Sequence, residues 1–285
     1  MDIIRAVNDR VVRMRRITPD DTMRLKLGTE WPRAVENARH VEAYAMHYRS
    51  DGKLIAGFMV VPSQPVAEPL PCVVYNRGGA ADFGMVTRGM LLTHLAEVAR
   101  AGYAVIGSQY PGNSLSEGHD ERGGYSDLRS VIDMYEQIIR PVDVLDETRT
   151  SMYGFSRGGM MTYQLLRHVS WVRRAVVLGG LADLFRNIDQ RPEMAPVLKT
   201  AFGGTEAGMV ERSAVRWPEK INPNVPLLMV HGQSDWRVSP QDSQDMYRLL
   251  ISDANRLRLY DGDDHAVSKN RASFHDELIA WLGAG

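Results

Sequence analysis

The chain has 285 residues, 44% of them hydrophobic and 24% charged, so it is long enough to bury the core of one large globular domain. Its 34 basic and 35 acidic side chains nearly cancel, which argues against a nucleic-acid partner or an anionic membrane surface. The single cysteine excludes an internal disulfide, and no run approaches the roughly 18 apolar residues that a membrane span needs, so we expect a cytoplasmic protein.

The first forty residues predict a helical extension. Ile4, Val7, Val11 and Met14 fall on one face of a helix, with arginines around it. We interpret this pattern as a packed helix with a solvated basic face, in preference to a membrane-surface or nucleic-acid role. The segment 18–21 has the capping pattern that opens a second short helix.

From residue 41 onward the pattern changes to strands that alternate with helices. Two strands joined by a turn at 50–52 form a predicted hairpin, and a short apolar run around Cys72 predicts a strand buried on both faces, with its thiol a small buried group. The predicted strands are 43–49, 53–61, 72–75, 103–108, 150–153, 175–178, 226–230 and 257–260, and the predicted helices are 87–101, 124–140, 157–169, 241–252 and 272–282. This alternation indicates an α/β fold with a mostly parallel central sheet and helices on both faces.

One segment interrupts the alternation. Residues 180–224 contain no apolar strand, several prolines and scattered aromatic side chains. A long insertion at the carboxyl end of a strand is typical of a lid or a pocket wall. The predicted organisation is therefore an extension at 1–40 and a catalytic domain at 41–285, with a small cap insertion at about 180–224.

The pentapeptide 154–158 contains a candidate nucleophile, Ser156. It fits the pattern G-x-S-x-G, it follows a predicted strand directly and it precedes a predicted helix, which is the strand–turn–helix setting that a nucleophile elbow requires. The turn is crowded, so small residues are needed beside the serine, and Gly154 and Gly158 supply them. Alone, this pattern is also that of a glycine turn with an incidental serine.

A serine hydroxyl needs a base to take its proton and an acid to orient that base. Asp235 follows the strand 226–230 and His265 follows the strand 257–260, so the chain order serine, acid, histidine is the one expected of this arrangement. Asp263 and Asp264 are alternative acids, but they stand too close to His265 in sequence to reach its Nδ1 easily. We interpret His231, at a strand end before a glycine, as structural support.

Two backbone amides are expected to stabilise the oxyanion of a tetrahedral intermediate. One is the amide of Arg157, and the other belongs to the loop of Arg77, Gly78 and Gly79, whose glycines allow the backbone to approach a substrate closely. A phosphate-binding role for this loop is weaker, because no nucleotide-binding glycine pattern is present. We predict no metal and no cofactor, since no cluster of cysteine and histidine has zinc spacing.

With these residues assembled, the sequence resembles the α/β-hydrolase superfamily and, within it, the catalytic domain of the prolyl oligopeptidase family. Dienelactone hydrolases are near relatives, but their nucleophile is usually cysteine, where this chain has Ser156. The segments that carry the resemblance are 48–57, 76–79, 118–124 and 231–238. It covers most of the chain from about residue 41 and implies an α/β-hydrolase fold, a triad of Ser156, His265 and Asp235, and an acyl-enzyme intermediate.

The sequence departs from that family in two respects. The family normally carries an N-terminal β-propeller, for which the 40 residues before the predicted fold leave no room, and Asn76-Arg77 replaces the more familiar histidine before the glycine pair. We therefore expect a carboxylesterase that acts on a small-molecule acyl ester. The alternatives are a peptidase or amidase that acts on short peptides or aminoacyl amides, and a non-catalytic hydrolase-like binding protein. No nucleic-acid or membrane partner is expected, and self-association stays open.

Overall fold

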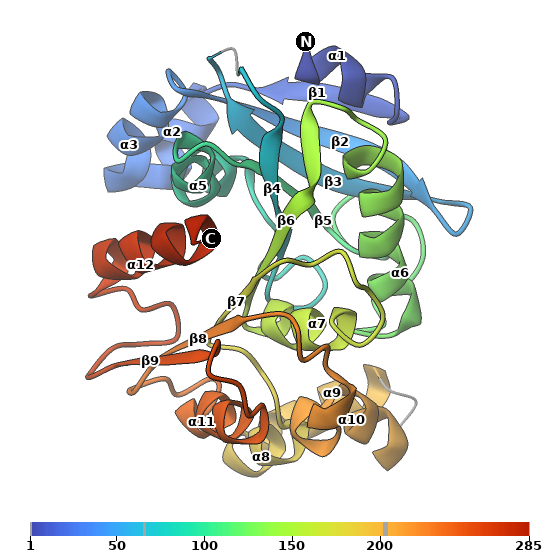
Figure 1. Ribbon diagram of the computed structural model, residues 1–285, viewed down its shortest axis with the longest axis vertical. Helices are drawn as coiled ribbons and strands as arrows, with labels where there is room; N and C mark the ends of the chain where they lie inside the picture. The colour runs from blue at the N-terminus through green and yellow to red at the C-terminus, as the bar shows by residue number, and fades with distance from the viewer. Residues whose placement is uncertain (1, 65–66, 202–204, 285) are drawn as a thin grey trace. The chain divides into compact units, whose positions relative to one another are not determined.

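The computed structural model describes residues 2–64, 67–201 and 205–284 (Figure 1). The chain forms two compact units. The first consists of Met1–Tyr75, Ala81–His119 and Arg129–Thr150, and the second of Asn76–Ala80, Asp120–Leu128 and Ser151–Gly285. The first unit thus continues past the boundary predicted at residue 40. Every candidate catalytic residue belongs to the second unit.

Five strands of the first unit lie in the order β1-β2-β3-β5-β4. The predicted hairpin is confirmed: β2 and β3 pair antiparallel, with Asp51 and Gly52 in the turn at positive φ. The β4–β5 pair is parallel, whereas β1–β2 and β3–β5 are antiparallel. The strands are β1 (Arg13–Ile17), β2 (Val41–Ser50), β3 (Lys53–Pro62), β4 (Leu70–Asn76) and β5 (Ala104–Ser108).

The helix predicted through Val11 and Met14 is wrong beyond its first turns. Helix α1 (Ile3–Asn8) ends early, and β1 follows it and pairs with residues 43–47 of β2. The edge of β2 offers unpaired backbone groups, and pairing with them outweighs a weak helical periodicity. Only Ile17 of β1 is buried, so β1 is an edge strand with a solvated arginine-rich surface.

The predicted helix 87–101 is present but divided by a turn of π-helix at Leu91–Leu95. Thr87 caps its start, because its hydroxyl accepts a hydrogen bond from the amide of Met90, and Gly102 ends it at positive φ. The other helices that lie wholly or partly in this unit are α2 (Asp21–Leu27), η1 (Gly28–Glu30), α3 (Trp31–Asn37), α4 (Arg88–Met90), α5 (Ala96–Arg100), α6 (Tyr125–Met134) and η3 (Tyr135–Ile139).

Four strands of the second unit lie parallel in the order β6-β7-β8-β9. The apolar runs of β7 and β8 are buried along their whole length, which confirms that they are covered on both faces. In β9, by contrast, burial alternates, as in an edge strand. The strands are β6 (Leu145–Phe155, of which 151–155 lie in this unit), β7 (Ala175–Leu178), β8 (Leu227–Gly232) and β9 (Arg256–Tyr260).

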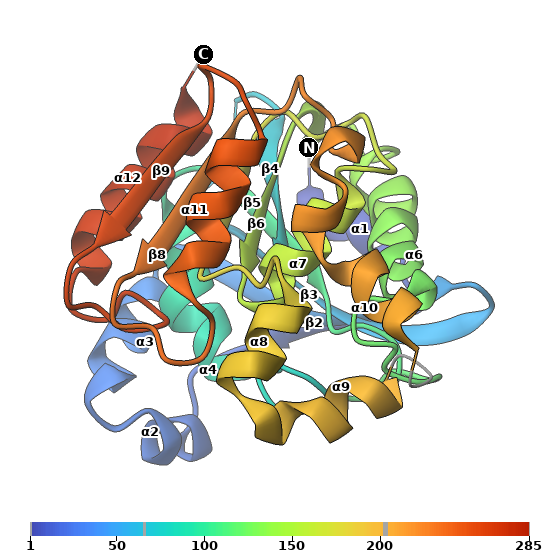
Figure 2. The same cartoon turned by 90° about the horizontal axis from the view of Figure 1, so that it is seen from below.

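Side-chain alternation assigns three helices of this unit, α7 (Arg157–Leu165), α11 (Pro240–Leu249) and α12 (Arg271–Gly283), to one or the other face of the sheet. Val177 of β7 pairs with Gly154 and lies against Gly159 of α7, and His231 of β8 bonds to Ser243 of α11 on the same face. Tyr153, one residue before Gly154, points the other way and its ring packs against Phe274 of α12. Figure 2 shows α11 and α12 on opposite sides of β8 and β9. The second unit is therefore a three-layer arrangement, as predicted.

In the described part of residues 180–224 the chain forms short helices and no strand. Their apolar side chains pack on Met160 of α7 in a cluster with Leu184, Leu198 and Met209. That this segment is a cap stays a prediction. The helices of the second unit are α7 (Arg157–Leu165), α8 (Leu184–Gln190), η4 (Pro192–Met194), α9 (Ala195–Ala201), α10 (Glu206–Arg212), η5 (Ala214–Arg216), η6 (Pro218–Lys220), α11 (Pro240–Leu249) and α12 (Arg271–Gly283). Of all the helices described, none has the length and apolarity to cross a membrane.

Candidate active site

Ser156 occupies a strained turn between β6 and α7. Its φ is 57° and its ψ is −119°, a conformation that non-glycine residues rarely adopt. The surrounding backbone holds it there: its amide donates to the carbonyl of Leu178 over 2.9 Å, and its carbonyl accepts from the amides of Gly159 and Leu181. The predicted elbow is thus formed where β6 ends and α7 begins.

The two glycines of the pentapeptide are required by close backbone approach. A Cβ on Gly158 would lie 1.8 Å from the carbonyl oxygen of Asn76, and a Cβ on Gly154 would lie 2.3 Å from the carbonyl oxygen of Gly158. Neither contact is tolerable for a real side chain, so the small residues around Ser156 are needed for packing. Close backbone approach, and not only the conformational freedom of a turn, therefore requires glycine at both positions.

The structure brings Asp235 and His265 together from the loops after β8 and β9. His265 Nδ1 lies 2.6 Å from Asp235 Oδ2, which orients the imidazole. The His265 ring lies 5.0 Å from the ring of Phe155, the residue before Ser156. Among the described residues the Ser156 hydroxyl makes no hydrogen bond to His265. In ligand-free structures catalytic hydrogen bonds are often long and tighten only when substrate binds.

The Asp235 side chain is fully buried and accepts hydrogen bonds on both oxygens. Oδ1 accepts from the amides of Arg237 and Val238 over 2.8 and 3.1 Å, and Oδ2 accepts from His265 and His231. Burial works to raise the pKa of Asp235, but the hydrogen bonds from His231 and His265 outweigh it and hold this pKa well below its ordinary value. Asp235 is therefore an anion that can stabilise an imidazolium.

The alternative acids do not contact His265. Asp263 bonds to the amides of Asp264, Lys269 and Asn270, and Asp264 bonds to the amides of Ala266 and Ser268. Both carboxylates therefore shape the loop that carries the histidine.

The loop 76–79 lies directly beside Ser156. A Cβ on Gly78 would be 3.1 Å from the Ser156 Cβ, and Gly79 has a φ of 72° that suits glycine. Asn76 is completely buried, and its Nδ2 donates to Thr162 Oγ1 on α7 over 2.9 Å. Arg77, also completely buried, donates to the carbonyl of Gly78 over 3.0 Å. Asn76 and Arg77, which stand where the family more often has a histidine, therefore support the loop from its buried side.

The side chain of Arg157 has contacts that the sequence did not reveal. Its guanidinium donates to the carbonyl of Gly79 over 3.0 Å and forms ion pairs with Asp120 and Asp127, at 2.5 and 2.6 Å. Burial raises the pKa of Asp127 to about 6, against the lowering effect of Arg157. Asp120 lies in the segment 118–124 that carries the family resemblance. Its sequence position does not predict the ion pair with Arg157, which is 37 residues later.

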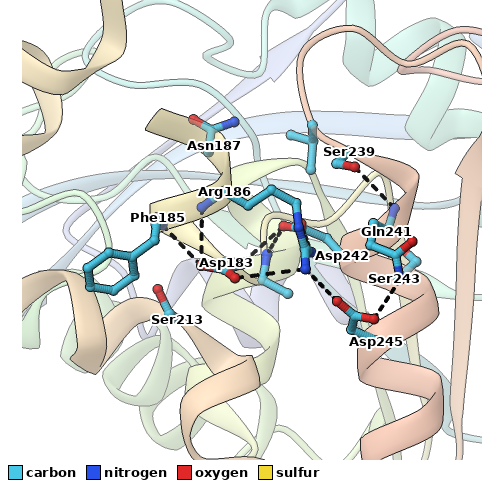
Figure 3. Close-up of polar contacts among 12 residues, drawn as sticks. Asp183, Phe185, Arg186, Asn187, Ser213, Ser239, Gln241, Asp242, Ser243 and Asp245 are labelled. Atoms are coloured by element: carbon cyan, nitrogen blue, oxygen red, sulfur yellow. Dashed lines mark hydrogen bonds and ion pairs between the residues drawn. The ribbon is translucent and has the colours of Figure 1, made fainter. Parts of the chain in front are cut away.

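Another buried carboxylate, Asp242, lies in the first turn of α11 (Figure 3). Its Oδ2 accepts from the amides of Ala182 and Asp183 over 2.7 and 2.9 Å, and its Oδ1 accepts from Arg186 Nη1 over 2.7 Å. Arg186 also reaches Asp245, one turn further along the helix. Burial raises the pKa of Asp242, although these donors oppose the rise. The ion pairs join α11 to α8.

Comparison with family models and with known proteins identifies relatives of this chain. The model described as the prolyl oligopeptidase family matches residues 93–284. An uncharacterized peptidase of Bacillus subtilis, YtmA, is 28% identical over 216 residues, which cover 72% of this chain and 78% of the relative. The acylamino-acid-releasing enzyme of Sus scrofa is 26% identical over 83% of this chain, but the chain spans only 34% of that enzyme.

Solved structures with the same fold include peptidases and an esterase. The acylaminoacyl peptidase of Pyrococcus horikoshii superposes with a TM-score of 0.71 at 17% identity, over 87% of this chain and 42% of that one. The esterase Est22 superposes with a TM-score of 0.66 at 16% identity, over 94% of this chain and 90% of that one. These likenesses confirm the α/β-hydrolase fold. Because the family model matches more than half of the chain, the protein belongs to the prolyl oligopeptidase family of serine hydrolases.

Proposed function

We propose that this protein cleaves a small acyl ester through a triad of Ser156, His265 and Asp235. The observation that carries the proposal is the elbow: Ser156 is held at positive φ directly beside the loop 76–79, and the hydrogen-bonded pair of Asp235 and His265 belongs to the same unit. Strain of this kind is retained when the surroundings over-determine it, as they do in a nucleophile elbow.

In the proposed reaction His265 Nε2 takes the proton of the Ser156 hydroxyl as Oγ attacks the carbonyl carbon. The oxyanion that forms accepts hydrogen bonds from the amide of Arg157 and from one amide of the loop Arg77–Gly79. His265 then gives its proton to the departing alkoxide, which leaves an acyl-enzyme. Water attacks this ester in the same way, and Ser156 regains its proton. Asp235 stays ionised and balances the charge of the imidazolium.

A peptidase or amidase that uses the same triad is the second candidate. Its support is that YtmA is called a peptidase and that the porcine relative is called an acylamino-acid-releasing enzyme. The support for an ester is that Est22, which superposes over 94% of this chain, is called an esterase. Family membership implies a small substrate for either reaction.

The leaving group separates the two candidates. Matched pairs of substrates with one acyl group, N-acetylalanine p-nitrophenyl ester and N-acetylalanine p-nitroanilide, are assayed with the wild-type protein and with Ser156→Ala. Each kcat/KM is divided by the rate of the same compound with hydroxide, because the ester is intrinsically more reactive. We expect a larger normalised value for the ester. A larger value for the anilide would replace the esterase proposal by the peptidase.

The third reading, a hydrolase-like binding protein, predicts no turnover at all. A fluorophosphonate that labels the wild-type protein but not Ser156→Ala would exclude it. No labelling of either protein would favour it over both enzymatic candidates.

A further inference from the structure

We propose that His231 and Ser243 are positioning residues for the catalytic acid. In this arrangement the Ser243 hydroxyl fixes the orientation of the His231 imidazole, and the imidazole fixes the oxygen of Asp235 that holds His265. The inference rests on the proposed function, since it assigns a role toward the triad. It concerns two side chains that touch neither the substrate nor the reacting atoms.

The two oxygens of Asp235 are held by different kinds of group. Oδ1 accepts from the backbone amides of Arg237 and Val238, which belong to its own loop. Oδ2 accepts from imidazoles, with His231 Nε2 at 3.0 Å and His265 Nδ1 at 2.6 Å. During the reaction His265 changes its charge, so its bond to Oδ2 changes as well. His231 is the donor that keeps Oδ2 in place throughout.

The His231 ring is completely buried, and its contacts settle which nitrogen carries the hydrogen. Nε2 faces two acceptors, Asp235 Oδ2 and the carbonyl oxygen of Val238 at 3.1 Å, so it is the donor. Nδ1 lies 2.7 Å from Ser243 Oγ, a hydroxyl that can donate to it. When Ser243 donates to Nδ1, as we propose, the ring carries its hydrogen on Nε2 alone, and the charge of Asp235 stays available for His265.

Ser243 itself is fixed by its neighbour in sequence. Asp242 accepts from the amides of Ala182 and Asp183 and pairs with Arg186, and both Asp242 and Ser243 are about 1% exposed. Figure 3 shows the Arg186 guanidinium between Asp242 and Asp245, with Ser243 on the same helix. The hydroxyl therefore meets His231 from a helix that cannot shift easily, and the order of contacts is Ser243, His231, Asp235, His265.

Three variants test the proposal. His231→Leu removes the donor to Oδ2, and we expect kcat to fall about 10- to 100-fold with KM within about twofold, the scale of a hydrogen bond to a charged group. His231→Gln places an amide Nε2 close to the original donor, and we expect it to restore kcat to within about fivefold of wild type. Ser243→Ala removes one neutral hydrogen bond, and we expect kcat to fall about 3- to 10-fold.

The matched control is Gln244→Ala, because Gln244 is the next residue on α11 and its side chain accepts a long hydrogen bond from Arg248. A readout that a merely structural role would not move is the low-field proton resonance of His265 Nδ1–H. We expect it to shift in His231→Leu and less in Ser243→Ala, and to stay in place in His231→Gln and Gln244→Ala. The resonance also reports on variants that are only marginally stable, since it needs no turnover.

Two results would overturn the proposal. The first is wild-type kcat and an unshifted resonance in folded His231→Leu, while wild-type protein is still active and still labelled at Ser156. The second is an equal loss in His231→Leu and His231→Gln with an unshifted resonance, which would make the ring a packing group. If wild-type protein neither turned over esters nor reacted with a fluorophosphonate, the proposed function would fail together with this inference.

Discussion

Asp127 and Asp235 both have side chains with no exposed surface, yet their pKa values move in opposite directions. Asp235 accepts hydrogen bonds from four donors, and in the described part of the chain it shares none of them with a second carboxylate, so its anion is stabilised. Asp127 has Arg157 and the amide of Gly123, but it shares the guanidinium with Asp120. Burial raises the pKa of both carboxylates, but the donors outweigh it only at Asp235, while at Asp127 the like charge of Asp120 adds to the effect of burial.

The largest expected effect comes from replacing Asp235, the carboxylate that accepts four hydrogen bonds. Asp235→Asn keeps the shape of the side chain but removes the charge and places an amide against His265. We expect kcat for an ester substrate to fall about 10⁴-fold with little change in folding, as is typical when the acid of a triad is replaced. Steady-state kinetics and thermal unfolding check this. Activity within tenfold of wild type would remove Asp235 from the triad.

The next effect concerns the other carboxylate. Arg157→Leu leaves Asp127 buried without its cation, and we expect the free energy of unfolding to fall by about 3–5 kcal/mol. The matched control is Arg167→Leu, which loses a contact with the face of Trp217 and a longer hydrogen bond, and for which we expect about 1 kcal/mol or less. Urea titration of both variants measures the difference. Equal losses would mean that the ion pairs of Arg157 contribute nothing particular.

Asp127 also predicts how stability depends on pH. Its pKa of about 6 in the folded protein lies above its ordinary value of 3.8, so the folded state binds this proton more tightly than the unfolded state. The stabilisation is fully present below about pH 4 and is lost as the pH rises through about 6. Asp235 has the opposite sign, and its contribution is lost only in strong acid. The groups facing Asp127 are Arg157, Asp120 and, at longer range, Arg212.

The variant Asp127→Asn isolates the contribution of Asp127 to the pH dependence of stability. We expect the urea midpoint of wild-type protein to rise between pH 7 and pH 5 relative to the midpoint of the variant, because only the wild-type protein takes up the proton. Effects of pH that are common to both proteins cancel in this difference. Parallel midpoints over this range would contradict the raised pKa.

The smallest expected effect tests how much Asp120 contributes to the raised pKa of Asp127. Asp120→Asn removes the like charge that shares Arg157, and we expect the pKa of Asp127 to fall part of the way toward its ordinary value, since burial remains the main cause. We expect the free energy of unfolding of Asp120→Asn to depend on pH less steeply than that of wild type and more steeply than that of Asp127→Asn. At pH 7 this free energy should differ from that of wild type by about 1 kcal/mol or less. A slope equal to that of wild type would mean that Asp120 has no influence.

The acid–base side of the site could be predicted from sequence because each of its residues follows its own strand. Ser156, Asp235 and His265 stand after β6, β8 and β9, and a parallel sheet brings such positions to one edge. The hairpin and the buried strands were predictable for a similar reason, since local periodicity determines them. The structure adds that His231 supports Asp235 through a specific bond.

The remaining features of the site and of the fold could not be predicted, because they depend on contacts between residues that are far apart in the sequence. Nothing in the sequence distinguishes Asp120 and Asp127 from the other acidic side chains, or pairs Arg186 with Asp242 across 56 residues. The strand β1 was missed because the free edge of β2, and not a property of residues 13–17, makes it extended. The substrate was equally beyond prediction, since ester and amide hydrolysis need the same triad.

The central claim is that Ser156 is a nucleophile activated within this site, and covalent labelling tests it most directly. Wild-type protein, Ser156→Ala and Asp235→Asn are each incubated with a fluorophosphonate, and intact mass and peptide mapping follow the adduct. We predict one adduct per chain on Ser156 in wild-type protein, none in Ser156→Ala, and labelling of Asp235→Asn slowed by at least about 10²-fold. Labelling elsewhere, or equal labelling of Ser156→Ala, would contradict the account.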